Sequence, residues 1–313
     1  MVQNKFKFNK WLWLGILVQI MISPNQAIMK HAIGGMNFAY FSVLRYGLVF
    51  LISLPWLIKL IKLKPNKKGI QYSIMAGCLL ALAVLAHTYA LKSVDASYAS
   101  ILGLASPLFF IPISVKLEGD KINKKMVAGL SVSAAGAFMI VLLPIALRGD
   151  AKFELNIFAT LLLLVGVIAG AFFTVLSRKA NEHGIGFNSI ISITSGVGLL
   201  AYSAVFFIST GGNIGGSLSL SPSQIMAVMF SAIIVIFLAR RWSLMVYEKT
   251  GPIVSSALGY LETLLSVLVS IVFLGESISK EIVLGGVLII LGLYISEYHK
   301  SDSHKHVSQL KHR

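Results

Sequence analysis

The stretch "GPIVSSALGYLETLLSVLVSIVFLGES", Gly251 to Ser277, is long and apolar enough to cross a bilayer, yet it carries one acid, Glu262, near its middle. Read as a helix, it places small and polar residues on one stripe and Leu, Ile and Val over most of the remaining surface. The stripe consists of Ser255, Gly259, Glu262, Ser266 and Ser270. An acid at the bilayer centre costs about 3 kcal/mol, against about 0.5 kcal/mol gained per Leu or Ile. We therefore expect the stripe to face protein or water rather than lipid.

The composition of the whole chain is that of a polytopic membrane protein. Of its 313 residues, 56% are hydrophobic and 12% are charged, and the mean hydropathy is +0.82. Apolar runs of about 20 residues recur without the alternation typical of β-barrels, which predicts an all-α integral membrane fold in a lipid bilayer. The net charge of +15 does not indicate a nucleic-acid partner, because the basic residues lie between the apolar runs. The single cysteine, Cys78, excludes an intrachain disulfide.

The apolar runs predict ten transmembrane helices. Their ranges are 11–31, 38–60, 69–91, 95–117, 124–147, 155–178, 187–209, 223–247, 251–274 and 280–298. The remaining segment, 299–313, is polar and is predicted to be a disordered tail. Its four histidines either bind a metal or belong to a solvated basic tail beside anionic lipid. We expect the second, and no metal site.

The distribution of Lys and Arg predicts the orientation in the membrane. With the N-terminus in the cytoplasm, nineteen Lys and Arg residues lie in or beside the inner segments and five in or beside the outer ones. Cytoplasmic loops carry an excess of these residues. We therefore expect an integral plasma membrane protein, in the inner membrane of a bacterium, with both termini in the cytoplasm.

An internal repeat appears at an offset of 156 residues. The stretch "SILGLASPLFFIPISVKLEGDKINKKMVAG", residues 100–129, aligns with "SALGYLETLLSVLVSIVFLGESISKEIVLG", residues 256–285. Each half holds five predicted spans, and because five is odd the second half enters the membrane in the opposite sense. The sequence thus predicts two inverted five-helix repeats, at 1–150 and 151–298.

These features resemble the drug/metabolite transporter superfamily and, within it, the EamA-type transporters. The second copy carries the pattern clearly, in "SIVFLGESIS" and the following "VLGGVLIILGLYIS", whereas "VKLEGDKINKK" in the first copy departs from the usual Leu-Gly-Glu. The resemblance implies secondary transport by alternating access, often export coupled to protons or to an exchanged solute. It does not specify the substrate, because members handle amino acids, sugars, nucleotide derivatives, pigments and drugs.

Glu262 is the strongest candidate for a functional residue. It either binds the amino group of a substrate or carries a coupling proton, or it is a hydrogen-bonded acid that fixes helix packing. Its counterpart in the first half is neutral, Ser106, so the acid breaks the symmetry of the repeat. Gly259 and Tyr260, one turn before Glu262, are further candidates, although a tyrosine here is equally explained by packing.

The first predicted span carries a second polar stripe. Its candidate residues are Gln19, Ser23, Asn25 and Gln26, beside Pro24. A proline leaves a carbonyl free one turn back, which suits a broken helix that faces a substrate. A simple kink packed against a neighbouring helix is the alternative.

Three arginines lie within predicted spans. Arg45 is deep for an anchor at the membrane surface, and it either holds a substrate carboxylate or pairs with a helix end or an acid. Of Arg240 and Arg241, at least one is expected to be an interfacial anchor beside Trp242, and the other to face the inner gate.

No catalytic constellation is visible, and the sequence lacks a P-loop and an H-E-x-x-H site, so we expect neither an enzyme nor a cofactor. The predicted function is secondary active export of a small polar metabolite, an amino acid or a similar zwitterion, with coupling to protons or exchange. The alternatives are multidrug efflux and a lipid-handling or assembly protein that transports nothing.

Overall fold

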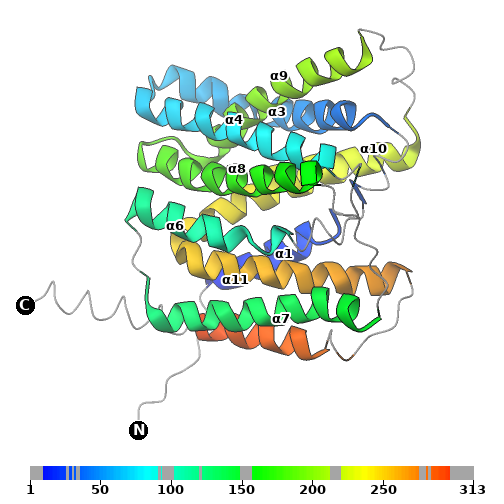
Figure 1. The fold of residues 1–313 in the computed structure, drawn as a ribbon. Helices are drawn as coiled ribbons and strands as arrows, with labels where there is room; N and C mark the ends of the chain where they lie inside the picture. Colours follow the sequence, from blue (N-terminus) through cyan, green and yellow to red (C-terminus); the bar gives the residue numbers. More distant parts are fainter. Residues whose placement is uncertain are drawn as a thin grey trace, which may run out of the picture.

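The computed structural model describes residues 10–25, 28–29, 32, 36–90, 93, 102–119, 122–148, 157–211, 220–274, 280 and 283–296, and within them all regular structure is helical (Figure 1). The helices are α1 (Lys10–Ile22), α3 (Phe38–Lys62), α4 (Lys67–Ala90), α6 (Ser106–Glu118), α7 (Lys124–Arg148), α8 (Ile157–Glu182), α9 (Phe187–Thr210), α10 (Pro222–Met229), the π-helix η2 (Phe230–Ala239), α11 (Arg240–Leu274) and a last helix, Val283–Ser296. The prediction of an all-helical protein is confirmed for this part of the chain. The number of spans stays a prediction.

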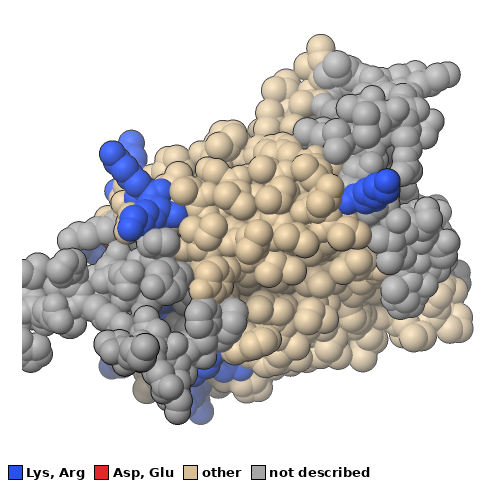
Figure 2. Space-filling view, turned by 90° about the horizontal axis from the view of Figure 1, so that it is seen from below, with Lys and Arg blue, Asp and Glu red and all other residues tan. Residues whose placement is uncertain are grey.

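Five helical stretches are long and apolar enough to cross a membrane. They are Phe38–Lys62, Lys67–Ala90, Ile157–Glu182, Phe187–Thr210 and Pro222–Ser266, and the shorter apolar helices Lys10–Ile22 and Val283–Ser296 join them. Large apolar side chains are exposed along these helices, for example Leu51, Leu200 and Ile208. In Figure 2, a broad uncharged belt separates basic residues at opposite ends of the molecule. An apolar belt between basic ends suits a bilayer.

Helix ends follow from local sequence. Asn37 caps α3, its side-chain oxygen accepting hydrogen bonds from the backbone N–H groups of Ala39 (2.9 Å) and Tyr40 (3.4 Å). Within α11, Gly251 adopts φ 78° and ψ 178°, a conformation that essentially only glycine tolerates, and Pro252 follows. Gly251 therefore divides α11 into two helical segments, and the chain changes direction between them.

Residues 156 positions apart in the sequence meet in space. The rings of Tyr46 on α3 and Tyr202 on α9 lie 4.8 Å apart. The Tyr260 hydroxyl donates to the Leu104 carbonyl at 3.3 Å. The Ser133 hydroxyl on α7 donates to the Ile289 carbonyl of the last helix at 3.1 Å. Contacts between equivalent positions are what a two-fold axis between two halves produces.

The helices α7 and Val283–Ser296 cross closely and run antiparallel. A Cβ on Gly129 would lie 2.8 Å from the Gly292 carbonyl oxygen, and one on Gly136 would lie 2.9 Å from the Ile289 nitrogen. The Ser296 hydroxyl donates to the Met126 carbonyl at 3.3 Å. Small residues at such crossings let two backbones approach each other.

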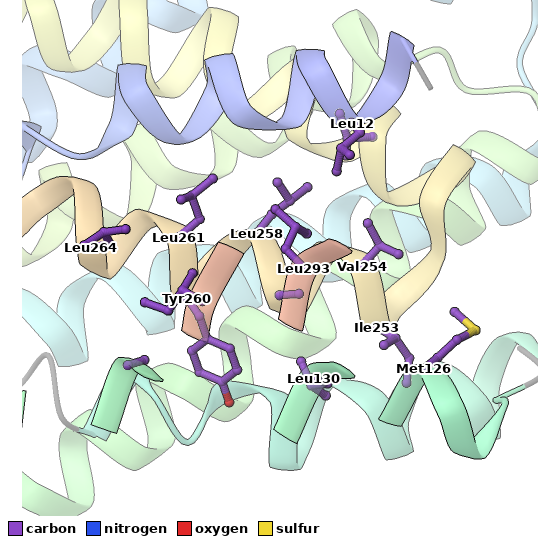
Figure 3. Packing of buried hydrophobic residues seen from close by; sticks show 14 of the residues in the cluster. Leu12, Met126, Leu130, Ile253, Val254, Leu258, Tyr260, Leu261, Leu264 and Leu293 are labelled. Carbon is purple, nitrogen blue, oxygen red and sulfur yellow. The ribbon is translucent and has the colours of Figure 1, made fainter. Parts of the chain in front are cut away.

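The apolar core has two main parts. One joins α3, α4, α8, α9 and η2, and the other joins α1, α7, α11 and the last helix. In the second part, Leu258 and Leu261 of α11 lie toward α1, whereas Tyr260 points away from α1 (Figure 3). The polar residues described next lie between and beside these two parts.

Candidate functional site

The predicted polar stripe is the accessible face of an otherwise buried helix. Between Pro252 and Leu264 the apolar side chains of α11 are mostly buried, whereas Ser255, Gly259 and Glu262 remain partly exposed. A Cβ on Gly259 would meet no atom within 4 Å, so the helix has open space on this side. Because this accessible face is polar, water suits it better than lipid does. Ser270 lies outside the described side chains.

Glu262 has no partner within the described part of the chain. Its side chain is partly exposed, and no described residue forms a hydrogen bond or an ion pair with it. Charged residues without a partner inside a membrane are rare and mark functional sites. Whether the carboxyl binds a substrate or a proton, or serves helix packing, stays a prediction.

The first helix runs parallel to the second segment of α11. A Cβ on Gly15 would lie 2.5 Å from Leu258, and the Ser266 hydroxyl donates to the Ser23 carbonyl at 3.1 Å. Gly15 and Ser23 are eight residues apart, as are Leu258 and Ser266. Gln19 lies four residues after Gly15, and Glu262 lies four residues after Leu258, so the two residues are at the same height along the paired helices. Gln19 is buried, at 8% exposure.

The residues after α1 reach Arg45 through Met29, whose sulfur contacts both Asn25 and Arg45. Helix α1 ends at Ile22, directly before Ser23 and Pro24. The Asn25 amide nitrogen contacts the Met29 sulfur at 3.3 Å, and its side-chain oxygen is buried with no hydrogen-bond partner among the described residues. Gln26 lies outside the described residues.

Arg45 is buried in α3 at 4% exposure, about two turns from the start of that helix. Its Nη1 donates to the Met29 sulfur (3.2 Å) and to the Ser231 hydroxyl (3.3 Å). Its guanidinium carbon lies 5.0 Å from the centre of the Phe41 ring and 5.5 Å from that of Tyr46. The Nε is buried without a hydrogen-bond partner among the described residues. None of the described groups that contact Arg45 is an acid.

Arg240 turns into the helix bundle, which decides between the two arginines of α11. Its Nη1 donates to the Tyr46 hydroxyl at 3.2 Å, and its guanidinium carbon lies 5.6 Å from the centre of the Phe173 ring. Arg241 is partly exposed and makes no such contact with the described residues. Arg45 and Arg240 thus meet the same tyrosine.

The π-helix η2 brings Arg240 to this position. Ser231 and Arg240 are nine residues apart, which is about two and a half turns of an α-helix, so α-helical geometry would place them on opposite faces. A π-helix has about 4.4 residues per turn, so nine residues make about two turns and return to the same face. Both residues accordingly face α3, where they contact Arg45 and Tyr46.

The other described acids lie at the end of the bundle where α6 and α8 finish. Glu118 pairs with Arg178 at 2.8 Å, and its side chain is fully buried. The Tyr247 hydroxyl donates to Glu118, and Glu182 pairs with Arg178 at 3.7 Å. Neither Glu118 nor Glu182 contacts Arg45 or Arg240.

The predicted site residues thus fall into two neighbourhoods. The first neighbourhood lies where α1 packs against α11 and contains Gln19, Ser23, Gly259 and Glu262. The second contains Asn25 and Arg45, which both contact Met29. Ser106 begins α6 and is partly buried near Leu104, which accepts the hydrogen bond from Tyr260.

Sequence reasoning did not find Met29, Tyr46 or Ser231. An offset of 156 residues links Tyr46 to Tyr202, and this signal could have identified the tyrosine pair. The partners of Arg45 on η2 and after α1 had no sequence signal.

Comparison with known proteins identifies the family of this chain. The sequence matches the EamA-like transporter family over residues 9–142 and 157–298. The chain belongs to the EamA-like transporter family. Each matched range falls within one of the two predicted repeats. Membership in this family makes the chain a membrane transport protein.

An uncharacterized transporter of Clostridium kluyveri is 25% identical to this EamA-like transporter over 274 residues, which cover 84% of this chain and 85% of the relative. A crystal structure of a protein with 15% sequence identity superposes with a TM-score of 0.70, covering 93% of this chain and 98% of the other. At this identity the likeness shows a shared fold alone.

Proposed function

We propose that this EamA-like transporter is a secondary active exporter of a small polar metabolite, an amino acid or a similar zwitterion, that works by alternating access. One observation carries the proposal: Glu262 has no partner among the described residues and lies on the accessible polar face of an otherwise buried helix. A carboxyl in such a place is free to bind a cationic group or to exchange a proton.

The contacts between equivalent residues support a transporter built from ten spans in two inverted halves. Tyr46 with Tyr202, and Leu104 with Tyr260, join the two halves at matched positions. Halves related in this way can exchange conformations, and alternating access in many transporters consists of such rocking of one half against the other.

The separation of Glu262 from the arginines favours a coupling role for the acid. The described contacts of Arg45 are with Met29, Ser231 and the rings of Phe41 and Tyr46, and Glu262 is not among them. A ligand that touches both Arg45 and Glu262 at once needs its charges set well apart. We therefore assign the coupling proton to Glu262 and the substrate's anionic group to the region of Arg45.

Counter-flow transport tests the proposal. Purified protein is reconstituted into vesicles that hold a panel of unlabelled metabolites, and uptake of the labelled compounds is measured for the wild type, Glu262→Gln and Glu182→Gln. We expect at least one solute to exchange in this assay. When a pH gradient is imposed across the vesicle membrane, uptake of that solute driven by the gradient should fall about tenfold or more in Glu262→Gln and stay near the wild-type rate in the control. Transport that is unchanged in Glu262→Gln contradicts the role of this acid, and a panel in which no solute exchanges contradicts the proposed transport.

A further inference from the structure

Five residues from four helical elements form what we call the basic centre: Arg45, Tyr46, Tyr202, Ser231 and Arg240. Helix α3 supplies the first two, α9 the third, η2 the fourth and the start of α11 the fifth. Both guanidinium groups lie within 6 Å of the Tyr46 ring centre, at 5.5 Å for Arg45 and 5.9 Å for Arg240. Two positive charges therefore share one aromatic side chain.

The contacts within the basic centre leave these charges uncompensated. Among the described residues, Arg45 donates only to a thioether sulfur, which is a weak acceptor, and to a serine hydroxyl. Arg240 donates to the Tyr46 hydroxyl. An arginine stays protonated in proteins, and a buried charge is normally paired or coordinated. No described acid contacts either arginine.

A second observation points to a ligand. The Nε of Arg45 is buried and has no hydrogen-bond partner among the described residues. Because Arg45 is only 4% exposed, water does not readily take the place of that partner. The Met29 sulfur and the Ser231 hydroxyl both accept from Nη1, so the N–H group of Nε is left without an acceptor. An oxygen atom of a bound ligand would satisfy this donor. Arginine forks bind carboxylates and phosphates with two parallel hydrogen bonds.

Resting on the proposed transport function, we infer that the basic centre binds the anionic part of the substrate and that the substrate carries a net negative charge. One carboxylate would neutralise only one of the two arginines. A dicarboxylate, an acidic amino acid or a phosphorylated metabolite would neutralise both. The inference narrows the proposed small polar metabolites to anionic ones. Of the amino acids and similar zwitterions, it keeps only those with a net negative charge, such as an acidic amino acid.

A competing explanation is that the arginines only join helices. Arg45 links α3 to η2, and Arg240 links α11 to α3 and lies over Phe173 of α8. If that were their whole role, an anion would bind no better than its neutral counterpart. All comparisons between an anion and its neutral counterpart are made at one fixed pH.

Ligand-dependent unfolding of the purified full-length protein in detergent tests the inference. The probes are succinate, L-glutamate and glycerol 3-phosphate, each compared with its neutral counterpart, succinamide, L-glutamine or glycerol, at equal ionic strength. We expect at least one anion to raise the unfolding temperature in a saturable way, while its neutral counterpart does not. In Arg240→Gln the apparent Kd for that anion should rise about tenfold or more.

Arg241→Gln is the matched control. It removes the same charge at the next residue, whose partly exposed side chain forms no hydrogen bond or ion pair with the described residues. It should bind the anion like the wild type. Arg45→Lys, which keeps the charge but loses the fork, should also weaken binding. The inference is overturned if none of the three anions binds saturably, if anions and neutral counterparts act alike, or if Arg240→Gln and Arg241→Gln give the same Kd.

Counter-flow transport with the same variants separates this inference from the proposed function. If an anion binds in an Arg240-dependent manner but no solute exchanges across the vesicle membrane, the transport proposal fails and the anion site stands. If a neutral solute exchanges and Arg240→Gln leaves its rate unchanged, transport stands and the anion site fails.

Discussion

Tyr46 is the residue on which both arginines converge, and its counterpart in the other half offers a control. Its hydroxyl accepts a hydrogen bond from Arg240 at 3.2 Å, whereas the Tyr202 hydroxyl makes no bond to Arg240. Both side chains are fully buried, and the two rings pack against each other. The two tyrosines therefore have similar burial and packing but different hydrogen bonding.

We predict that Tyr46→Phe lowers the free energy of unfolding by about 1.5 kcal/mol, because a hydrogen bond from a charged donor is lost and the donor stays inside the protein. Tyr202→Phe should change it by less than about 0.5 kcal/mol. Unfolding of both variants and of Arg240→Gln in detergent checks this. A double-mutant cycle in which Tyr46→Phe and Arg240→Gln are additive would rule out the interaction.

Glu118 and Glu182 provide the second residue-scale comparison, since both pair with Arg178. The Glu118 carboxylate is fully buried and lies 2.8 Å from Arg178, while Glu182 is 44% exposed and lies 3.7 Å away. Ser114 and Tyr247 also bond to Glu118, so it joins α6, α8 and α11. A buried network of this kind differs from an exposed pair in what its loss costs.

We predict that Glu118→Gln destabilises the protein by about 3 kcal/mol, because Arg178 then keeps its charge in a largely buried site without its main partner. Glu182→Gln should cost at most about 0.5 kcal/mol. The measurement is the unfolding midpoint of each variant under identical detergent conditions. Equal losses would mean that the Glu118 network adds nothing to an ordinary surface ion pair.

At the scale of elements, the crossing of α7 with the last helix depends on glycine. A Cβ on Gly129 would lie 2.5 Å from the Ser296 hydroxyl, 2.7 Å from the Ser296 nitrogen and 2.8 Å from the Gly292 oxygen. Two of these atoms belong to the backbone and cannot move aside cheaply. On α8, by contrast, a Cβ on Gly170 would meet no atom within 4 Å.

We therefore predict opposite effects for the same substitution. Gly129→Ala should destabilise the protein by about 1–3 kcal/mol through overpacking. Gly170→Ala should be neutral or stabilise it by up to about 1 kcal/mol, because alanine favours the helix and nothing opposes its methyl group. Thermal unfolding of the two variants distinguishes these outcomes. A neutral Gly129→Ala would mean that the two helices can separate at no cost.

The helices themselves could largely be predicted from the sequence, and the contacts of the site could not. The predicted ranges 38–60, 69–91, 124–147 and 187–209 each differ from α3, α4, α7 and α9 by no more than two residues at either end. Apolar runs bounded by polar turns make such boundaries visible.

The side on which Arg240 lies depends instead on η2. Its sequence, "FSAIIVIFLA", is as apolar as an ordinary transmembrane helix and gives no sign of π geometry. The burial of Glu118 was equally hidden, because a glutamate at a helix end usually faces solvent. In both cases tertiary packing decides what the local sequence leaves open.

At the scale of the whole molecule, both ends of the described chain lie on one side of the bundle. Leu12 of α1 shares an apolar cluster with Met126 at the start of α7, and Ser296 of the last helix bonds to Met126. Many Lys residues occur at this end, among them Lys62, Lys67 and Lys124 at the ends of α3, α4 and α7. By the positive-inside rule this end should be cytoplasmic.

Thiol labelling tests this orientation, since the natural chain holds only one cysteine. In a Cys78→Ala background, Lys67→Cys at the start of α4 and Ser223→Cys at the start of α10 place single thiols at exposed positions. A membrane-impermeant maleimide should label Ser223→Cys in intact cells and Lys67→Cys only after permeabilisation. The unsubstituted background, free of thiols, gives the blank. Labelling in the reverse order would contradict the predicted orientation, because it would place the Lys-rich end of the bundle on the outer side of the membrane.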